Sequence, residues 1–137
     1  MRNDYKIILD IIPSGSKVLD IGCSSGELLS LLNVKDDVQT QGVEINQEKV
    51  VTCLENGLDV VQGDINQILE DFPHNQFDYC ILTQTIQTVN APDKLLQLLK
   101  KVGKNIIISF DNSNYYKRVF NFSVKGSFDN LLGESHE

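Results

Sequence analysis

Residues that could bind a polar ligand lie at or just after the ends of four short apolar runs of the sequence. They are Asp20, Gly22, Cys23, Ser24 and Gly26 after the first run, Glu44 and Ile45 after the second, Asp64 and Ile65 after the third, and Thr83 and Gln84 after the fourth. In an open parallel sheet, ligands bind outside the carboxyl ends of the strands. If the four runs are strands of one sheet, these residues form one binding site.

The loop from Asp20 to Gly26 favours a ligand without a pyrophosphate. Its glycines fit neither the GxGxxG pattern of nicotinamide enzymes nor the GK[ST] ending of phosphate-binding loops. Gly22 and Gly26 lack the Cβ that would keep a ligand away from the backbone, and the amides that open the next helix can face a carboxylate. Alone, such a loop could be only a turn, but the acids at the neighbouring strand ends favour binding.

The acids specify the ligand further. Glu44 comes 24 residues after Asp20, close to the separation of about 20 residues at which an acid binds ribose hydroxyls. Asp64 can accept the exocyclic amine of an adenine. We expect the Glu44 carboxylate to face solvent, and the negative charge favours a cationic adenosine ligand. S-adenosylmethionine fits this description, with S-adenosylhomocysteine as its demethylated product, whereas a nicotinamide oxidoreductase is a weaker alternative.

Cysteine spacing predicts no metal site. Cys23, Cys53 and Cys80 form neither a CxxC pair nor a zinc-ligand pattern. Each lies in or beside an apolar run, so a buried, inert thiol is favoured over a reactive one, even for Cys23 near the loop. The odd number of cysteines argues against a disulfide framework and predicts a cytoplasmic protein.

Strand and helix patterns alternate along the chain, which predicts a doubly wound α/β fold with a Rossmann-like parallel sheet of about five strands. The predicted strands span residues 17–22, 38–45, 58–62, 77–82 and 105–110. The predicted helices lie at 5–12, 28–32, 46–56, 66–72, 91–102 and 115–124, with Gly103 as the residue that ends the fifth of them. We expect one ligand-binding domain over residues 1–124 and a polar C-terminal tail over 125–137.

Composition excludes several classes of protein. With 41% hydrophobic and 23% charged residues, the chain is expected to fold around one core. A net charge of −7 makes nucleic acid and membranes poor partners. Its apolar stretches fall short of the roughly 20 residues that cross a bilayer, and its start does not have the form of a secretion signal.

The sequence also resembles the MetW family of class I methyltransferase-like proteins. The resemblance runs from about Tyr5 to about Gly126. The phrases that carry it are 17–23 with 26–29, 42–45, 61–64, and 77–79 with 81–87. Its more specific features are the Gln62-Gly63-Asp64 phrase and the pair formed by Gln84 and Gln87.

The resemblance implies a fold that binds S-adenosylmethionine. It also implies a role in methionine biosynthesis, together with a homoserine acyltransferase. Methyl transfer is then the default reaction, and a non-catalytic regulatory partner of the acyltransferase is the alternative. The sequence departs from the family at Ser24, where the motif usually has glycine, so the loop is expected to sit differently. The last two strands of the fold are expected to be missing, which would leave the fifth strand as an open edge for a partner or for self-association.

Overall fold

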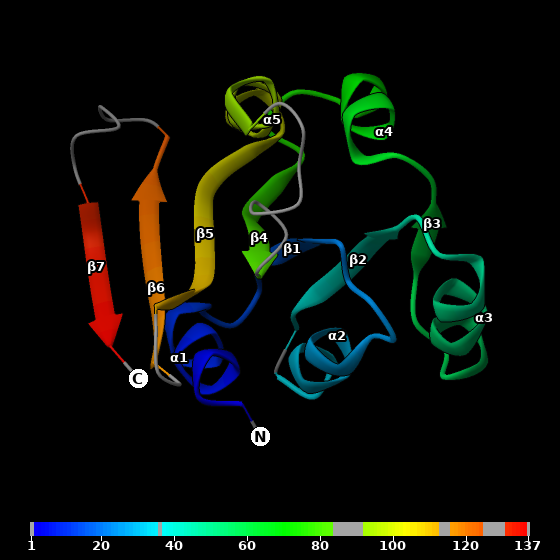
Figure 1. Cartoon of the computed structure of the whole chain (residues 1–137), viewed down its shortest axis with the longest axis horizontal. Coiled ribbons are helices and arrows are strands. Elements are labelled where there is room, and N and C mark those ends of the chain that lie inside the picture. Colours follow the sequence, from blue (N-terminus) through cyan, green and yellow to red (C-terminus); the bar gives the residue numbers. More distant parts are fainter. Residues whose placement is uncertain (1, 36, 84–91, 113–115, 125–130, 137) are drawn as a thin grey trace.

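The computed structural model describes residues 2–35, 37–83, 92–112, 116–124 and 131–136. Five helices and seven strands are assigned within these ranges (Figure 1). The helices are α1 (Asn3–Ile11), α2 (Glu27–Asn33), α3 (Gln47–Glu55), α4 (Ile65–Asp71) and α5 (Pro92–Val102). The strands are β1 (Lys17–Ile21), β2 (Gln39–Glu44), β3 (Val60–Gln62), β4 (Phe77–Thr83), β5 (Gly103–Asn112), β6 (Tyr116–Ser123) and β7 (Leu131–His136).

The strands form one sheet in the order β3-β2-β1-β4-β5-β6-β7. The first five are parallel, and β6 and β7 are antiparallel. Chain order reverses at β1, where Asp20 is in register with Gly42 of β2 on one side and Ile81 of β4 on the other. This reversal creates the crevice in which doubly wound folds bind ligands. The predicted fold class is therefore confirmed.

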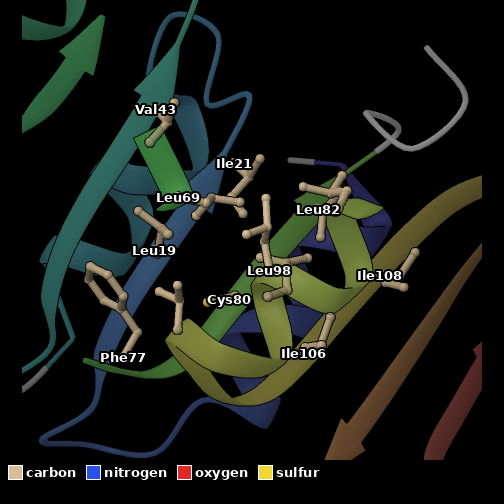
Figure 2. Packing of buried hydrophobic residues seen from close by; sticks show 13 residues of the cluster. Leu19, Ile21, Val43, Leu69, Phe77, Cys80, Leu82, Leu98, Ile106 and Ile108 are labelled. Atoms are coloured by element: carbon tan, nitrogen blue, oxygen red, sulfur yellow. The ribbon is translucent and has the colours of Figure 1, made fainter. Parts of the chain in front are cut away.

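Along each strand the side chains point alternately to the two faces of the sheet, so the sheet separates two layers of the core. Val18 and Ile81 point toward a cluster with α1 and α2, whereas Leu19, Ile21 and Leu82 point toward a cluster with α4 and α5. Figure 2 shows the second cluster, in which α5 packs across β4 and β5. Both faces of the central strands are covered, which explains why apolar residues of β1 and β4 point to both faces of the sheet.

Local signals fix the helix ends as predicted. The Asn46 side chain caps α3 by accepting the Lys49 amide at 3.1 Å. Gly57 follows the end of α3 with a φ of 76°, which a glycine adopts without steric cost. The end of α1 has a contact that the sequence did not predict, in which the Lys35 ammonium donates to the carbonyls of Leu9 and Ile12 and so satisfies backbone acceptors left by the helix.

The C-terminal part of the chain corrects three expectations. Residues 116–123 form β6 instead of the predicted helix over 115–124, and Val119 is almost fully buried against the α1 side of the sheet. The sheet has seven strands rather than about five, because β6 and β7 are added to the five predicted strands, β6 next to β5 and β7, from residues 131–136 of the expected tail, next to β6. Consequently β5 is paired on both sides, and the expected open edge at the fifth strand is wrong.

Gly103 is also used differently from the prediction. It begins β5 directly after α5, and its φ is not positive. A Cβ at this position would lie 2.6 Å from the Cys80 Sγ. The glycine is needed because β4 and β5 pack closely here, rather than because the helix requires a left-handed final residue.

Candidate functional site

The loop after β1 folds back onto the end of β2. The amides of Gly22 and Cys23 both donate to the Val43 carbonyl, at 2.8 and 3.0 Å. The next amide, that of Ser24, donates to Glu44 Oε1 at 2.7 Å. The structure thus brings the predicted glycine loop and the predicted acid at the end of β2 into direct contact.

Glu44 is more buried than expected. Its relative exposure is 8%, although the sequence predicted a solvent-facing carboxylate. While Oε1 accepts the Ser24 amide, Oε2 accepts the Asn46 amide at 3.0 Å. The carboxylate is buried because these two backbone donors, on loops that follow different strands, converge on it.

Three alternate positions of the loop have left-handed backbone. Gly22 has a φ of 71°, Ser24 of 55° and Gly26 of 88°. At Gly26 a Cβ would also lie 2.3 Å from Cδ1 of the buried Leu58, so the missing Cβ makes room for packing and not, as predicted, for a ligand. Ser24 is exposed and adopts a conformation that favours glycine, which is how the loop accommodates the departure noted in the sequence.

Asp20 is an almost fully buried acid of the site. It lies at the end of β1 with 1% relative exposure, and its Oδ1 has no hydrogen-bond partner among the described residues. Burial, together with repulsion from Glu44, raises the pKa of Asp20 to about 8, against a smaller opposing effect of Arg2. The carboxyl group is therefore mostly protonated at neutral pH.

The other predicted site residues are spread around this centre. Asp64 is exposed at the start of α4, where its Oδ1 accepts the Asn66 amide at 2.8 Å. Ile45 is 67% exposed, Ile65 is partly buried, and Thr83 is partly buried at the end of β4. Gln84 lies outside the described residues.

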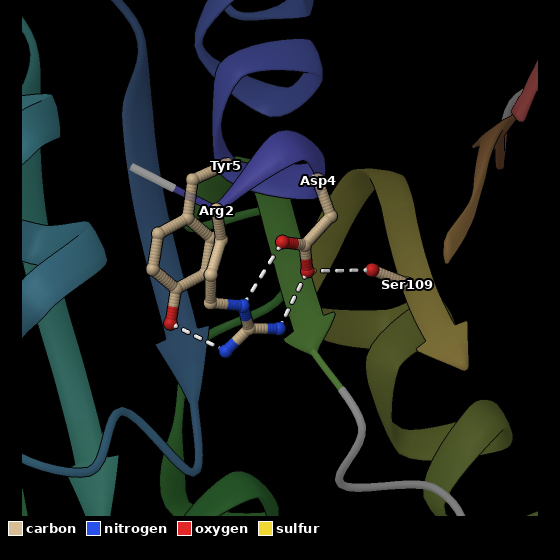
Figure 3. A network of polar contacts seen from close by, with 4 residues as sticks. All are labelled: Arg2, Asp4, Tyr5 and Ser109. Atoms are coloured by element: carbon tan, nitrogen blue, oxygen red, sulfur yellow. Dashed lines mark hydrogen bonds and ion pairs between the residues drawn. The ribbon is translucent and has the colours of Figure 1, made fainter. Parts of the chain in front are cut away.

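A polar network near these strand ends was not predicted from the sequence. Asp4 is fully buried and binds Arg2 at two points, Nε at 3.0 Å and Nη2 at 2.6 Å. The Ser109 hydroxyl of β5 donates to the same carboxylate at 2.8 Å, and Arg2 also donates to the Tyr5 hydroxyl (Figure 3). The signal for it was the helical spacing of Asp4 from the buried Ile8 and Ile12.

The cysteines are free thiols, and all three are buried. Burial raises the pKa of Cys23 well above its usual range, and it raises the pKa of Cys80 to about 12. Protonated thiols of this kind are poor nucleophiles and poor metal ligands. In the part of the chain that the structure describes, no group of three or more metal-binding side chains occurs, and no helix has the length and apolarity to span a membrane.

Comparison with known sequences identifies the family. The family model described as methionine biosynthesis protein MetW matches residues 2–131. The bifunctional methionine biosynthesis protein MetXA/MetW of Rhodopirellula baltica is 36% identical over 139 residues, covering 96% of this chain and 22% of that protein. Carboxy-S-adenosyl-L-methionine synthase of Campylobacter concisus is 31% identical over 128 residues, covering 90% of this chain and 50% of that protein. The chain thus spans half or less of these relatives.

Solved structures support the same fold. An S-adenosylmethionine-dependent methyltransferase from Archaeoglobus fulgidus has a TM-score of 0.70 at 25% identity, covering 82% of this chain and 52% of its own. Phosphoethanolamine N-methyltransferase 2 of Haemonchus contortus, solved with S-adenosylhomocysteine, has a TM-score of 0.71 at 22% identity, covering 83% of this chain and 28% of its own. The chain belongs to the MetW family and has the fold of class I S-adenosylmethionine-dependent methyltransferases.

Proposed function

We propose that this chain binds S-adenosylmethionine at the carboxyl ends of β1, β2 and β3 and acts as a methyltransferase-like protein in methionine biosynthesis. The observation that carries the proposal is the convergence of two buried acids, Asp20 and Glu44, beside the glycine loop. Two acids in one crevice favour a ligand that combines hydroxyl donors with positive charge.

The acceptors at the site match an adenosine. Each Glu44 oxygen accepts one backbone amide, and each retains lone-pair capacity for a ribose hydroxyl. Ile45 presents an exposed apolar side chain next to Glu44, which suits the face of an adenine. Asp64 uses Oδ1 to cap α4, and its second oxygen is an acceptor suited to the adenine amine.

Asp20 matches the cationic part of the ligand. Its buried Oδ1 has no partner among the described residues, and a buried acceptor of this kind is costly unless a ligand or water satisfies it. A positive charge placed beside it would favour the ionised carboxylate and lower its pKa from about 8. We therefore assign Asp20 to the ammonium end of the ligand.

Methyl transfer places few demands on side-chain chemistry. When bound, S-adenosylmethionine supplies an electrophilic methyl group on a sulfonium. The part of the protein is to align an acceptor and to exclude water, so a dedicated general base is not required. The three free, buried cysteines also favour a reducing compartment, which supports a cytoplasmic location.

A regulatory role is the second candidate. The relative in Rhodopirellula baltica joins MetXA and MetW in one polypeptide. Such a fusion favours a chain that acts together with a partner protein. The family resemblance suggests that this partner is a homoserine acyltransferase. Two assays distinguish the roles. A regulatory chain changes acyltransferase activity when it binds the adenosyl ligand, and it transfers no methyl group.

Calorimetric titration tests the binding step. The chain is titrated separately with S-adenosylmethionine, S-adenosylhomocysteine and NAD. Saturable binding of the two adenosyl compounds without a response to NAD is the expected result. Saturation by NAD with no response to either adenosyl compound would refute the proposal.

A further inference from the structure

The peptide groups of Ser24 are held from two directions. Its amide donates to Glu44 Oε1 at 2.7 Å, and its carbonyl accepts the Cys53 thiol at 3.2 Å. Glu44 ends β2 and Cys53 lies on α3, so the two contacts come from consecutive elements of the second βα unit. The loop after β1 is thereby fixed to the unit that follows it.

These contacts matter because Ser24 is a non-glycine residue in left-handed backbone. Its φ of 55° is unfavourable for a residue with a Cβ, and such a conformation persists only where the surroundings impose it. Ser24 itself is exposed, so packing around its side chain does not supply the constraint. The hydrogen bonds to its amide and carbonyl restrain it directly, beside those from the Gly22 and Cys23 amides to the Val43 carbonyl.

Cys53 is suited to this role. It is fully buried at 0% relative exposure, and its Sγ would lie 3.0 Å from a Cβ at Gly26. The thiol therefore contacts the Ser24 carbonyl and occupies the space that a side chain at residue 26 would need. Burial raises the pKa of the Cys53 thiol, so the thiol stays protonated at neutral pH and can donate to the Ser24 carbonyl. The Cys23 thiol reaches the same carbonyl at a longer distance of 3.7 Å.

We propose that Cys53 is a positioning residue of the ligand site, which acts through Ser24 by holding the loop after β1 in its binding conformation before the ligand arrives. The proposal rests on the proposed function, because it assigns the loop to the S-adenosylmethionine site. Preorganisation of this kind raises affinity by reducing the ordering that binding must impose.

Four variants separate positioning from packing. Cys53→Ala removes the thiol donor, and Cys53→Ser keeps a donor at the same position. Cys80→Ala is the matched control, since Cys80 is an equally buried cysteine on β4. The fourth variant combines Cys53→Ala with Ser24→Gly. Glycine at position 24 adopts positive φ without steric cost, so it does not depend on the hydrogen bond from the Cys53 thiol.

Two readouts are used. Calorimetry measures the Kd of S-adenosylhomocysteine, and amide hydrogen exchange of the unliganded chain measures protection over residues 22–26. We expect Cys53→Ala to weaken binding about threefold to tenfold, the range of one neutral hydrogen bond, and to speed exchange in the loop. Cys53→Ser should stay within about twofold of the parent chain. Adding Ser24→Gly should restore part of the affinity lost by Cys53→Ala, because glycine removes the steric cost of positive φ but leaves the loop more freedom.

Cys80→Ala should lower thermal stability, as loss of a buried side-chain atom does, without changing either loop readout. Unchanged affinity and unchanged loop exchange in Cys53→Ala would overturn the proposal, as would an equal loss of affinity in Cys80→Ala. If Cys53→Ala does not fold, a Cys53→Ser chain with faster loop exchange and weaker binding would contradict the expected rescue. Failure of the parent chain to bind either adenosyl compound would refute the proposed function instead. Amide exchange over residues 22–26 would then still show whether the Cys53 thiol holds the loop.

Discussion

Glu44 Oε1 and the Ser24 amide are joined by a 2.7 Å hydrogen bond that connects the end of β2 to the loop after β1. The same carboxylate accepts the Asn46 amide through its second oxygen. Glu44 is therefore a structural acceptor in the unliganded protein, and in our proposal it is also the ribose acceptor. These two roles make different predictions for the same substitution.

Glu44→Gln should lower both affinity and stability. Glutamine offers one oxygen to two backbone donors, and its amide group then faces the second donor. We expect the free energy of unfolding to fall by about 1–3 kcal/mol and affinity for S-adenosylhomocysteine to fall roughly tenfold or more. Urea denaturation and calorimetry measure the two effects. Glu48→Gln, the same change at an exposed position in the first turn of α3, is the control. It should leave affinity unchanged and lower the free energy of unfolding by less than about 1 kcal/mol, the effect of a charge near a helix N-terminus. A fully stable Glu44→Gln chain would contradict the structural role.

Asp64→Asn separates binding from folding more cleanly. Asparagine caps helices about as well as aspartate, so it can replace the Asp64 oxygen that accepts the Asn66 amide. Its second atom is then a donor, which cannot accept an adenine amine. Stability should change by no more than about 0.5 kcal/mol, while affinity for S-adenosylhomocysteine falls several-fold. Unchanged affinity would remove Asp64 from the adenine site.

The stability of the unliganded protein should decrease with pH because of Asp20. The folded-state pKa of about 8 lies above the ordinary value of 3.8, so between these values the folded chain keeps a proton that the unfolded chain has lost. Stability contributed by this proton is complete below about pH 4 and is lost progressively up to about pH 8.

Asp20→Asn removes this titration. The variant should gain stability relative to the parent chain as pH rises, by a few kcal/mol across the window. Urea denaturation at pH 5, 7 and 8.5 measures the difference. Parallel profiles for the two chains would show that Asp20 does not titrate as described.

The network of Arg2, Asp4 and Ser109 should respond asymmetrically to substitution. The Asp4 side chain is fully buried, whereas the Arg2 side chain is 32% exposed. Arg2→Met leaves a buried carboxylate without its cation and should cost about 3–5 kcal/mol. Asp4→Asn leaves a guanidinium that water can reach and should cost about 1–2 kcal/mol. Denaturation of both variants measures the order, and a larger loss for Asp4→Asn would contradict this assignment of burial.

Much of the parallel sheet could be predicted because its signals are local. The run from Lys17 to Ile21, the Asn46 cap and the Gly57 stop each depend on neighbouring residues, and the structure confirms all three. The segment 116–123 differs because its aromatic and basic residues fit helical spacing as well as alternation. Pairing with β5 makes it a strand, and that contact lies outside the segment itself.

The convergence of the strand ends could be predicted, but the contacts between their side chains could not. Strand ends converge in a parallel sheet, which is why Asp20 and Glu44 could be assigned to one edge. The burial of Glu44 could not be predicted, because it depends on where the loop directs the Ser24 amide. Cys53 was predicted only as a packing residue, since its contact with Ser24 joins residues 29 positions apart.

Amide chemical-shift mapping tests the central claim most directly. The ¹⁵N-labelled chain is titrated with S-adenosylhomocysteine while its backbone amides are followed individually. We predict that the largest shifts fall at the strand ends, on Ser24, Ile45 and Ile65. Shifts confined instead to the groove between α2 and α3, around Leu31, Val34 and Thr52, or saturable shifts with NAD and none with S-adenosylhomocysteine, would contradict it.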